Sequence, residues 1–326
     1  MLRSLVGSEM CIRDRYNIDV DSIKDYATLN DALQTIKEGE GKSKYPMQLA
    51  QGSTFNGFFN NYDGLASGLQ PIGVKYDDAS RKVVCTLEQD DIMDGLNWLH
   101  KWYQDGIINP DANVVTDGGK GSIFGSAQGW PAAATTWAFN AGIEKYDLTQ
   151  VFGPLYTTET IQGSMNAISA NSKYKTEALK VLQLMNTDSK FRDMCAYGTE
   201  GNYMEYAEDG TVQKLRDDWN WPSYTQGTFF ILSTQADGDP DAWNQVKEQN
   251  ESAVSSTCLG FALDVTNIQN EIANCNTVWD KYKNDLLTGA SDPATAVPAC
   301  IEELKAAGLD TVIEEAQKQV DEFFAN

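Results

Sequence analysis

The stretch GSMNAISANSKYKTEALKVLQLMNTD, residues 163–188, carries the clearest indication of fold class in this chain. Its first part, residues 164–170, is predicted to form a short strand that ends in small residues. A helix follows, in which Ala178, Leu182 and Met185 share one face, and the stretch ends in Asn-Thr-Asp. A strand that leads into a capped helix is typical of an α/β layer fold, which we therefore expect here.

Outward from this stretch, the apolar spacing predicts mostly helices. Ile92, Leu96, Leu99 and Tyr103 step by four, three and four residues, and Gly106 ends the run. Further helices are expected at residues 28–37, from Asp239-Pro240 onward, and at 268–286, 297–306 and 310–324. Short strands are expected between them, at residues 46–50, 83–87, 122–126 and 151–155.

Three tryptophans on these helices are predicted to be packed: Trp279 in the core, and Trp98 and Trp102 in the core or at an interface. Trp98 and Trp102 lie on or beside a helical stripe, and Trp279 lies on the stripe of its own helix. The single histidine, His100, is expected on a helix surface without a functional role. The buried stripe of the last helix is predicted to comprise Ile313, Ala316, Val320 and Phe323.

Length and charge narrow the classes of function. A chain of 326 residues is long enough for two lobes, and no apolar run approaches the ~18–20 residues of a membrane helix. The net charge of −22 disfavours nucleic acid and anionic lipid as partners, because both need clustered Lys and Arg. Most metal sites and most His-activated nucleophiles need histidine, and the chain has only one, so we expect no metal and no cofactor.

Residues 1–15, MLRSLVGSEMCIRDR, differ from the rest: they carry a charge of +1, against −23 for the remainder. The segment is too short and too polar for a signal peptide. It resembles a translated adapter sequence found at the starts of proteins predicted from assembled reads. We therefore expect residues 1–15 to be non-native and the protein to be truncated near Tyr16; the alternative is a native, frayed N-terminus.

Five cysteines remain beyond that segment, at positions 85, 195, 258, 275 and 300. No CxxC pair occurs, which disfavours zinc ribbons and thioredoxin-type chemistry. Either all are buried thiols, or two of the last four form a disulfide in an oxidising compartment; both alternatives stay open.

Four segments, in order, resemble extracellular family 1 solute-binding proteins, the receptor lipoproteins of carbohydrate ABC importers. They are LNWLHKWYQDGIINPDA (96–112), the stretch 163–188, AYGTEGNYMEYAEDG (196–210) and the ending that starts at GFALDVTNIQNEI (260–272). The ending looks like the C-terminal domain of unknown function in a lipoprotein subgroup of Gram-positive bacteria. One departure is Asn202-Tyr203, where the family usually has His-Tyr.

The resemblance implies a two-lobe periplasmic-binding-protein-like α/β fold with a hinge and a ligand cleft, missing the first part of lobe one. Residues 16–155 would form most of lobe two, residues 156–190 would return to lobe one, and residues 191–326 would complete both lobes. Such a protein is not an enzyme: it binds a sugar or oligosaccharide in the cleft and delivers it to ABC permease subunits. We expect an extracellular monomer that a lipid anchors to the outer face of the cell membrane.

Aromatic residues in loops are the candidate ligand contacts, because a sugar offers C–H faces to rings and hydroxyls to polar groups. The candidates are Gln128, Trp130, Trp137, Trp219, Trp221, Tyr224 and Asp264. A loop aromatic can also pack as a satellite cluster beneath its own loop, and this alternative stays open for each.

Other functions rank lower. Asp237, Asp239, Asp241 and Glu248 fit a calcium-loop pattern, but Ala242 stands where that loop needs Gly, so a helix start is the better interpretation. A glycoside hydrolase or lyase needs two carboxylates around one bond, and 47 acidic residues make any such pair uninformative. A surface glycan-binding module usually shows repeats or a β-rich pattern. The enzyme and the surface module remain the alternatives to a receptor.

Overall fold

The computed structural model describes residues 5–66, 68, 71–116, 123–127, 129–130, 133, 146–150, 152–216, 218–219, 221, 223, 225–236 and 238–325. The chain divides into two compact units. Unit 1 comprises Met1–Gly129, Ala133–Thr160 and Ala253–Asn326, and unit 2 comprises Trp130–Ala132 and Ile161–Ser252. Among the described helices, none is both long enough and apolar enough to cross a membrane.

Two helices of unit 1 follow the predicted spacing closely: α2 (Tyr26–Glu40) and α3 (Asp90–Gln104). The Asp25 carboxylate accepts a hydrogen bond from the Thr28 N–H, and Thr28 Oγ1 accepts one from the Asp25 N–H, which fixes the start of α2. The buried faces include the predicted residues: Leu29, Leu33 and Ile36 on α2, and Ile92, Leu96 and Leu99 on α3.

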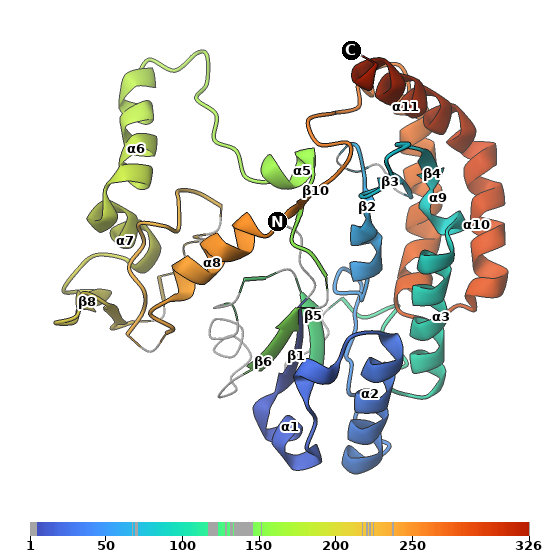
Figure 1. The fold of residues 1–326 in the computed structure, drawn as a ribbon, viewed down its shortest axis with the longest axis horizontal. Helices are drawn as coiled ribbons and strands as arrows, with labels where there is room; N and C mark the ends of the chain where they lie inside the picture. Colours follow the sequence, from blue (N-terminus) through green and yellow to red (C-terminus); the bar gives the residue numbers. More distant parts are fainter. Residues whose placement is uncertain are drawn as a thin grey trace. The chain divides into compact units, whose positions relative to one another are not determined.

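Three helices at the C-terminal end of unit 1 pack together: α9 (Gln269–Leu287), α10 (Pro293–Ala307) and α11 (Leu309–Phe324) (Figure 1). The Asp292 carboxylate caps α10, and Gly308, at φ 112°, ends it. α11 buries Leu309, Val312, Ala316 and Val320, because this row faces α9 and β4. The predicted stripe is therefore wrong at Ile313, which is half-buried, and at Phe323, which is 50% exposed.

The predicted core roles of Trp102 and Trp279 are confirmed. Trp102 is fully buried, and its ring centroid lies 5.9 Å from that of Phe55 in an edge-on arrangement. Trp279 is 3% exposed and meets Phe59 edge-on at 6.1 Å. Trp98 is partly buried against the same cluster.

His100, which was expected on a helix surface, lies on α3 and is partly buried. Its Nδ1 is 2.8 Å from the carbonyl oxygen of Gly289. Gly289 has φ 77°, and a Cβ there would come within 2.2 Å of the Leu99 carbonyl oxygen. The chain after α9 thus packs directly on α3, and this contact covers the histidine.

The sheets of unit 1 are small. β1 (Leu5–Glu9) pairs antiparallel with β5 (Phe124–Ala127) and β6 (Tyr146–Gln150), and α1 (Met10–Tyr16) follows β1. A second antiparallel sheet has the order β2 (Tyr62–Asp63), β3 (Ile72–Lys75) and β4 (Val83–Cys85). β7 (Leu155–Tyr156) and β10 (Val254–Ser255) pair in parallel. Short 3₁₀ helices lie at Val20–Ser22, Gly57–Asn61 and Thr86–Glu88.

Unit 2 contains α6 (Lys175–Thr187), α7 (Ser189–Tyr197), the hairpin of β8 (Met204–Tyr206) and β9 (Val212–Lys214), and α8 (Ala242–Glu251); α5 (Thr158–Ile161) leads into it (Figure 1). Its hydrophobic core is formed by Ala196, Tyr197, Met204, Val212 and Leu232. α6 buries Met185, whereas Leu179 is 60% exposed and Leu184 is 40% exposed. The apolar residues of α6 thus extend beyond the face of the helix that is buried.

Some predicted elements are wrong or displaced. The strand expected at 164–170 is absent: these residues are almost all exposed, and the described part of the chain pairs no strand with them. Residues 46–50 form isolated bridges rather than a strand. α8 begins after Asp241 rather than at Asp239, whose carboxylate instead accepts a hydrogen bond from the Asp241 N–H at 2.8 Å.

The expected lobe boundaries stay predictions. Residues 191–252 lie in unit 2 and residues 253–326 lie in unit 1, so the last expected segment runs through both units. Residues 5–16, within and beside the segment expected to be non-native, form β1 and α1 of unit 1.

Candidate functional site

Three aromatic rings of unit 2 form a stack, which we call the aromatic stack: Trp130, Phe229 and Trp243. The Trp130 and Phe229 centroids are 6.1 Å apart with planes inclined at 29°. Phe229 and Trp243 are 4.8 Å apart with planes inclined at 20°. All three side chains are half-buried. In such a stack Phe229 has a ring on each side, so only the outer faces of the end rings, Trp130 and Trp243, are not covered by the stack itself. A half-buried indole face is an apolar surface of the kind on which a sugar ring can stack.

The loop that carries Phe229 also carries two of the predicted site residues. Trp219 Nε1 donates a hydrogen bond to the Cys195 carbonyl oxygen at 3.0 Å, and its ring lies 5.3 Å from that of Tyr203. Trp221 is half-buried, and its Nε1 is enclosed without a hydrogen-bond partner among the described residues. The same holds for Nε1 of Trp243. Oxygen atoms of a ligand or of water can act as acceptors for these two indole donors.

The fully buried guanidinium of Arg192, on α7, lies beneath this loop. Its Nε donates to the Thr228 carbonyl oxygen at 3.0 Å, and its Nη2 donates to that of Ser223 at 2.8 Å. Its Cζ is 5.8 Å from the Phe229 ring centroid, within cation–π range. Burial lowers the pKa of this guanidinium from its ordinary value, while favourable interactions with nearby groups oppose that shift.

Asp264, the predicted acidic contact, lies in unit 1. It is exposed, and its carboxylate accepts hydrogen bonds from the N–H and the hydroxyl of Thr266, which hold its pKa below the usual value. Its backbone N–H and carbonyl oxygen both bond the side chain of Gln319. These bonds account for the residue as part of a turn before α9, and its ligand role stays a prediction.

The structure brings three of the seven predicted site residues into unit 2: Trp130, Trp219 and Trp221. Gln128, Trp137 and Tyr224 lie outside the described residues. Sequence reasoning missed Phe229, Trp243 and Arg192. Phe229 gave a weak signal as an aromatic residue in the same loop, whereas an arginine on a helix normally indicates a solvated face.

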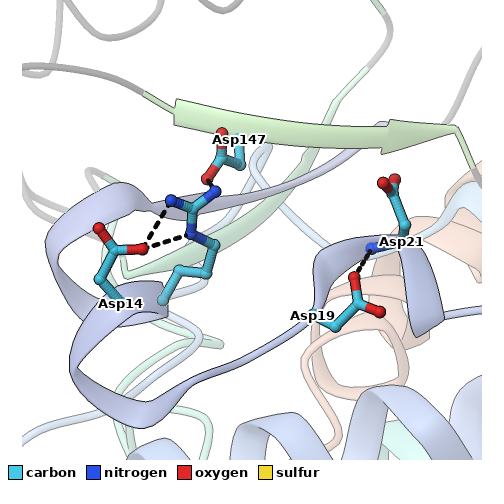
Figure 2. A network of polar contacts seen from close by, with 5 residues as sticks. Asp14, Asp19, Asp21 and Asp147 are labelled. Carbon is cyan, nitrogen blue, oxygen red and sulfur yellow. Dashed lines mark hydrogen bonds and ion pairs between the residues drawn. The ribbon is translucent and has the colours of Figure 1, made fainter.

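A cavity of about 560 Å³ opens in unit 1, lined by four carboxylates and one arginine, with Asn17, Ile18, Val20 and Leu148 completing the wall. Figure 2 shows the four carboxylates, and Asp19 accepts a hydrogen bond from the Asp21 N–H. Arg13 forms ion pairs with Asp14 and Asp147. The arginine and one carboxylate come from residues 1–15, which the sequence analysis expects to be non-native. No group of three or more His, Cys, Asp or Glu residues in the described part of the chain could hold a metal ion.

The five cysteines beyond residue 15 are all free thiols, so the disulfide alternative is wrong for them. Burial raises the pKa of the Cys85 and Cys258 thiols to about 11 and that of Cys300 to about 12. A thiol with so high a pKa is a poor nucleophile, and these side chains act as small hydrophobic core groups.

The comparisons with known proteins agree with each other. Residues 257–325 match the family model described as a domain of unknown function, DUF3502, as the sequence analysis expects for this ending. A carbohydrate ABC transporter substrate-binding protein of Streptococcus pneumoniae is 27% identical over 327 residues. The match covers 96% of this chain, and the chain spans 65% of the length of that curated relative.

Solved structures share the fold. The N-glycan transport solute binding protein NgtS of Streptococcus pneumoniae superposes with a TM-score of 0.88 at 24% identity, covering 99% of this chain and 73% of that one. NgtS in complex with Man5GlcNAc gives 0.83 at 25% identity, over 100% of this chain and 73% of that one. An HMO-binding, ABC-transporter-associated solute-binding protein of Bifidobacterium longum infantis gives a TM-score of 0.59 at 14% identity, over 98% of this chain and 72% of that one.

These matches confirm the predicted fold class, the mixed α/β fold of solute-binding proteins. The relatives are named as substrate-binding proteins, not as enzymes. By sequence along nearly its whole length and by its fold, the chain is thus related to the substrate-binding proteins of carbohydrate ABC transporters.

Proposed function

We propose that this chain is the ligand-binding part of the receptor of a carbohydrate ABC importer. It binds an oligosaccharide reversibly and releases it unchanged to the permease. The observation that carries the proposal is the match of almost the entire chain to NgtS, which has been solved with Man1GlcNAc and with Man5GlcNAc. The high acidic charge suits a secreted protein that need not touch anionic lipid.

The aromatic stack of unit 2 supports this function, because half-buried, near-parallel rings suit the apolar face of a pyranose. We place Trp130 at the sugar, with Trp219 and Trp221 in the neighbouring loop. The enclosed Nε1 atoms of Trp221 and Trp243 are donors that oxygen-rich ligands can satisfy. Gln128, Trp137, Tyr224 and Asp264 stay predicted contacts.

The remaining parts of the proposal follow from the role. The protein acts outside the cell, held at the membrane by a lipid anchor, and works as a monomer that meets the permease subunits of its transporter. Ligand would favour the closed arrangement of the two lobes, because only that arrangement lets both contact the sugar. The protein carries out no chemistry on its ligand.

A binding screen with product analysis tests the proposal. The purified protein is titrated with Man1GlcNAc, Man5GlcNAc and a fructo-oligosaccharide, and binding is followed by calorimetry and by the rise in melting temperature. Mass spectrometry then shows whether the glycan is recovered intact. We expect saturable binding of at least one glycan and full recovery. A shortened glycan would support the enzyme alternative, and no binding across the screen would contradict the proposal.

Gene disruption separates the receptor from a surface module. Loss of the gene should abolish uptake of the bound glycan, whereas loss of an adhesion module would leave uptake unchanged.

A further inference from the structure

Two adjacent charged residues on α7, Arg192 and Asp193, are almost fully buried, with 0% and 1% of their surface exposed. Neither makes an ion pair in the described part of the chain. Burying a charge without a partner of opposite sign is costly, so each side chain is held by hydrogen bonds. Those bonds are directed mainly at one loop, residues 219–233.

Arg192 fixes the middle of this loop. Besides its bonds to the carbonyl oxygens of Ser223 and Thr228, it packs beneath Gly227, which has φ 74°. A Cβ at Gly227 would lie 2.9 Å from Arg192 Nε and 2.9 Å from the Met185 carbonyl oxygen. The loop therefore closes directly onto the guanidinium, and no larger residue fits at this turn.

Asp193 fixes the end of the loop. Its carboxylate accepts hydrogen bonds from the N–H and the hydroxyl of Ser233, both at 2.8 Å, and from the Tyr206 hydroxyl at 2.9 Å. The Tyr197 hydroxyl donates to the Ser233 carbonyl oxygen at 2.7 Å. Burial, with the contact to Asp193, raises the pKa of the Tyr206 hydroxyl.

Phe229 lies between the two fixed points. It follows Thr228, whose carbonyl oxygen bonds Arg192, and it is the middle ring of the aromatic stack. The guanidinium also faces the Phe229 ring. The position of Phe229, and with it the surface against which Trp130 rests, thus depends on Arg192.

From this arrangement we infer that Arg192 is a positioning residue for a sugar subsite formed at the aromatic stack. Arg192 holds Phe229, Phe229 supports one face of Trp130, and Trp130 offers its other face to a sugar ring. Arg192 itself does not contact the ligand, because it is fully buried. This inference rests on the proposed function for its ligand, and its geometry can be tested without one.

Substitution Arg192→Lys is the first test. A lysine keeps the charge but lacks the planar guanidinium, so it cannot bond both carbonyl oxygens in the same geometry or lie flat against Phe229. Arg81→Lys, in unit 1, is the matched control. Arg81 Nε also donates a hydrogen bond to a carbonyl oxygen, that of Thr257, and its Cζ lies 4.0 Å from the centroid of an aromatic ring, that of Phe324.

The ligand-free readout is the environment of the tryptophans. Near-UV circular dichroism and acrylamide quenching are compared for each arginine variant with and without Trp130→Ala. Arg192→Lys should change the Trp130 contribution while leaving far-UV dichroism unchanged, and Arg81→Lys should leave that contribution as it is. An unchanged Trp130 signal in folded Arg192→Lys would overturn the inference.

The ligand readout is a double-mutant cycle with Man5GlcNAc by calorimetry. Arg192→Lys should weaken binding about tenfold or more, and it should have no further effect when Trp130 is already Ala. Equal effects in both backgrounds would show that Arg192 acts elsewhere and would overturn the inference. Should the unmodified protein bind none of the screened glycans, the proposed function fails, while the spectroscopic result still decides the positioning role.

Discussion

The C-terminal helices of unit 1 bury a continuous row of apolar side chains, whereas α6 of unit 2 leaves Leu179, Val181 and Leu184 in solvent. Unit 1 has one large hydrophobic cluster that links α2, α3 and α9 to α11. In the described part of unit 2, the hydrophobic cluster comprises five buried residues, and Arg192 and Asp193 are buried as well. Hydrophobic burial therefore stabilises unit 1, while hydrogen bonds to buried charges hold the loop of unit 2 in place.

Thiol reactivity should show the largest contrast between the units. In a Cys11→Ser background at pH 8, Cys195 of unit 2, which is half-buried, should react with DTNB in the native protein. Four thiols of unit 1 are buried, have raised pKa values and stay protonated at this pH: Cys85, Cys258, Cys275 and Cys300. They become accessible only when the protein unfolds, so they should react at least ~10³-fold more slowly than Cys195. Burial raises the pKa of the Cys195 thiol as well, so the contrast depends on solvent access: the reaction of Cys195 should become faster as the pH rises, while the four buried thiols stay protected. Simultaneous reaction of all five would contradict the comparison; Cys195→Ser is the control.

Trp102→Ala tests the core of unit 1. Trp102 is fully buried against Phe55 and Trp98, so its truncation should lower the free energy of unfolding by about 3–5 kcal/mol. Urea unfolding followed by far-UV dichroism measures this. Val114→Ala, at a site that is 64% exposed in the same unit, should change it by less than about 0.5 kcal/mol. A small effect of Trp102→Ala would mean that unit 1 does not depend on this cluster.

Asp193→Asn tests the hydrogen bonds that Ser233 and Tyr206 donate to this carboxylate in unit 2. The amide cannot accept all three hydrogen bonds from Ser233 and Tyr206 that the carboxylate accepts, so we expect a loss of about 1.5–3 kcal/mol. The measurement is hydrogen exchange of the amides in residues 225–236, compared with Asp209→Asn, because the Asp209 carboxylate is exposed and accepts its hydrogen bonds from Thr211 only two residues away. Unchanged protection in Asp193→Asn would show that these hydrogen bonds do not hold the loop in place.

Leu184→Ser should have the smallest effect. The side chain is 40% exposed, so removing it should change the free energy of unfolding by no more than about 0.5 kcal/mol. Met185→Ala, one residue further along α6 and 3% exposed, should cost about 2–5 kcal/mol. Chemical denaturation of the two variants gives both values, and a large loss in Leu184→Ser would show that this face is covered in solution.

The helices were predicted well from the sequence, because the apolar residues that recur with helical spacing in α2, α3, α9 and α10 all face one core. The prediction failed where pairing between distant segments decides the structure. Residues 164–170 have strand-like composition, but a strand requires a partner, and the described residues supply none. The rotation of α11 about its axis was also missed, since it depends on how α9 and β4 meet the helix.

The candidate site was predicted in part. Loop aromatics flanked by Gly and Pro pointed to Trp130, Trp219 and Trp221, which all lie in unit 2. Phe229 and Trp243 could not be assigned to Trp130 from sequence, because they approach it only through tertiary packing. Arg192 was missed for a physical reason: a buried arginine without a carboxylate partner is rare, and sequence alone favours a surface position.

Calorimetric titration of the unmodified protein and of Trp130→Ala with Man5GlcNAc, side by side, tests the central claim most directly. We expect saturable binding to the unmodified protein and a loss of about 1–3 kcal/mol of binding free energy in Trp130→Ala, with the melting temperature nearly unchanged. Equal affinity of the two proteins would remove the aromatic stack from the sugar site, and a glycan recovered in cleaved form would contradict the receptor function itself.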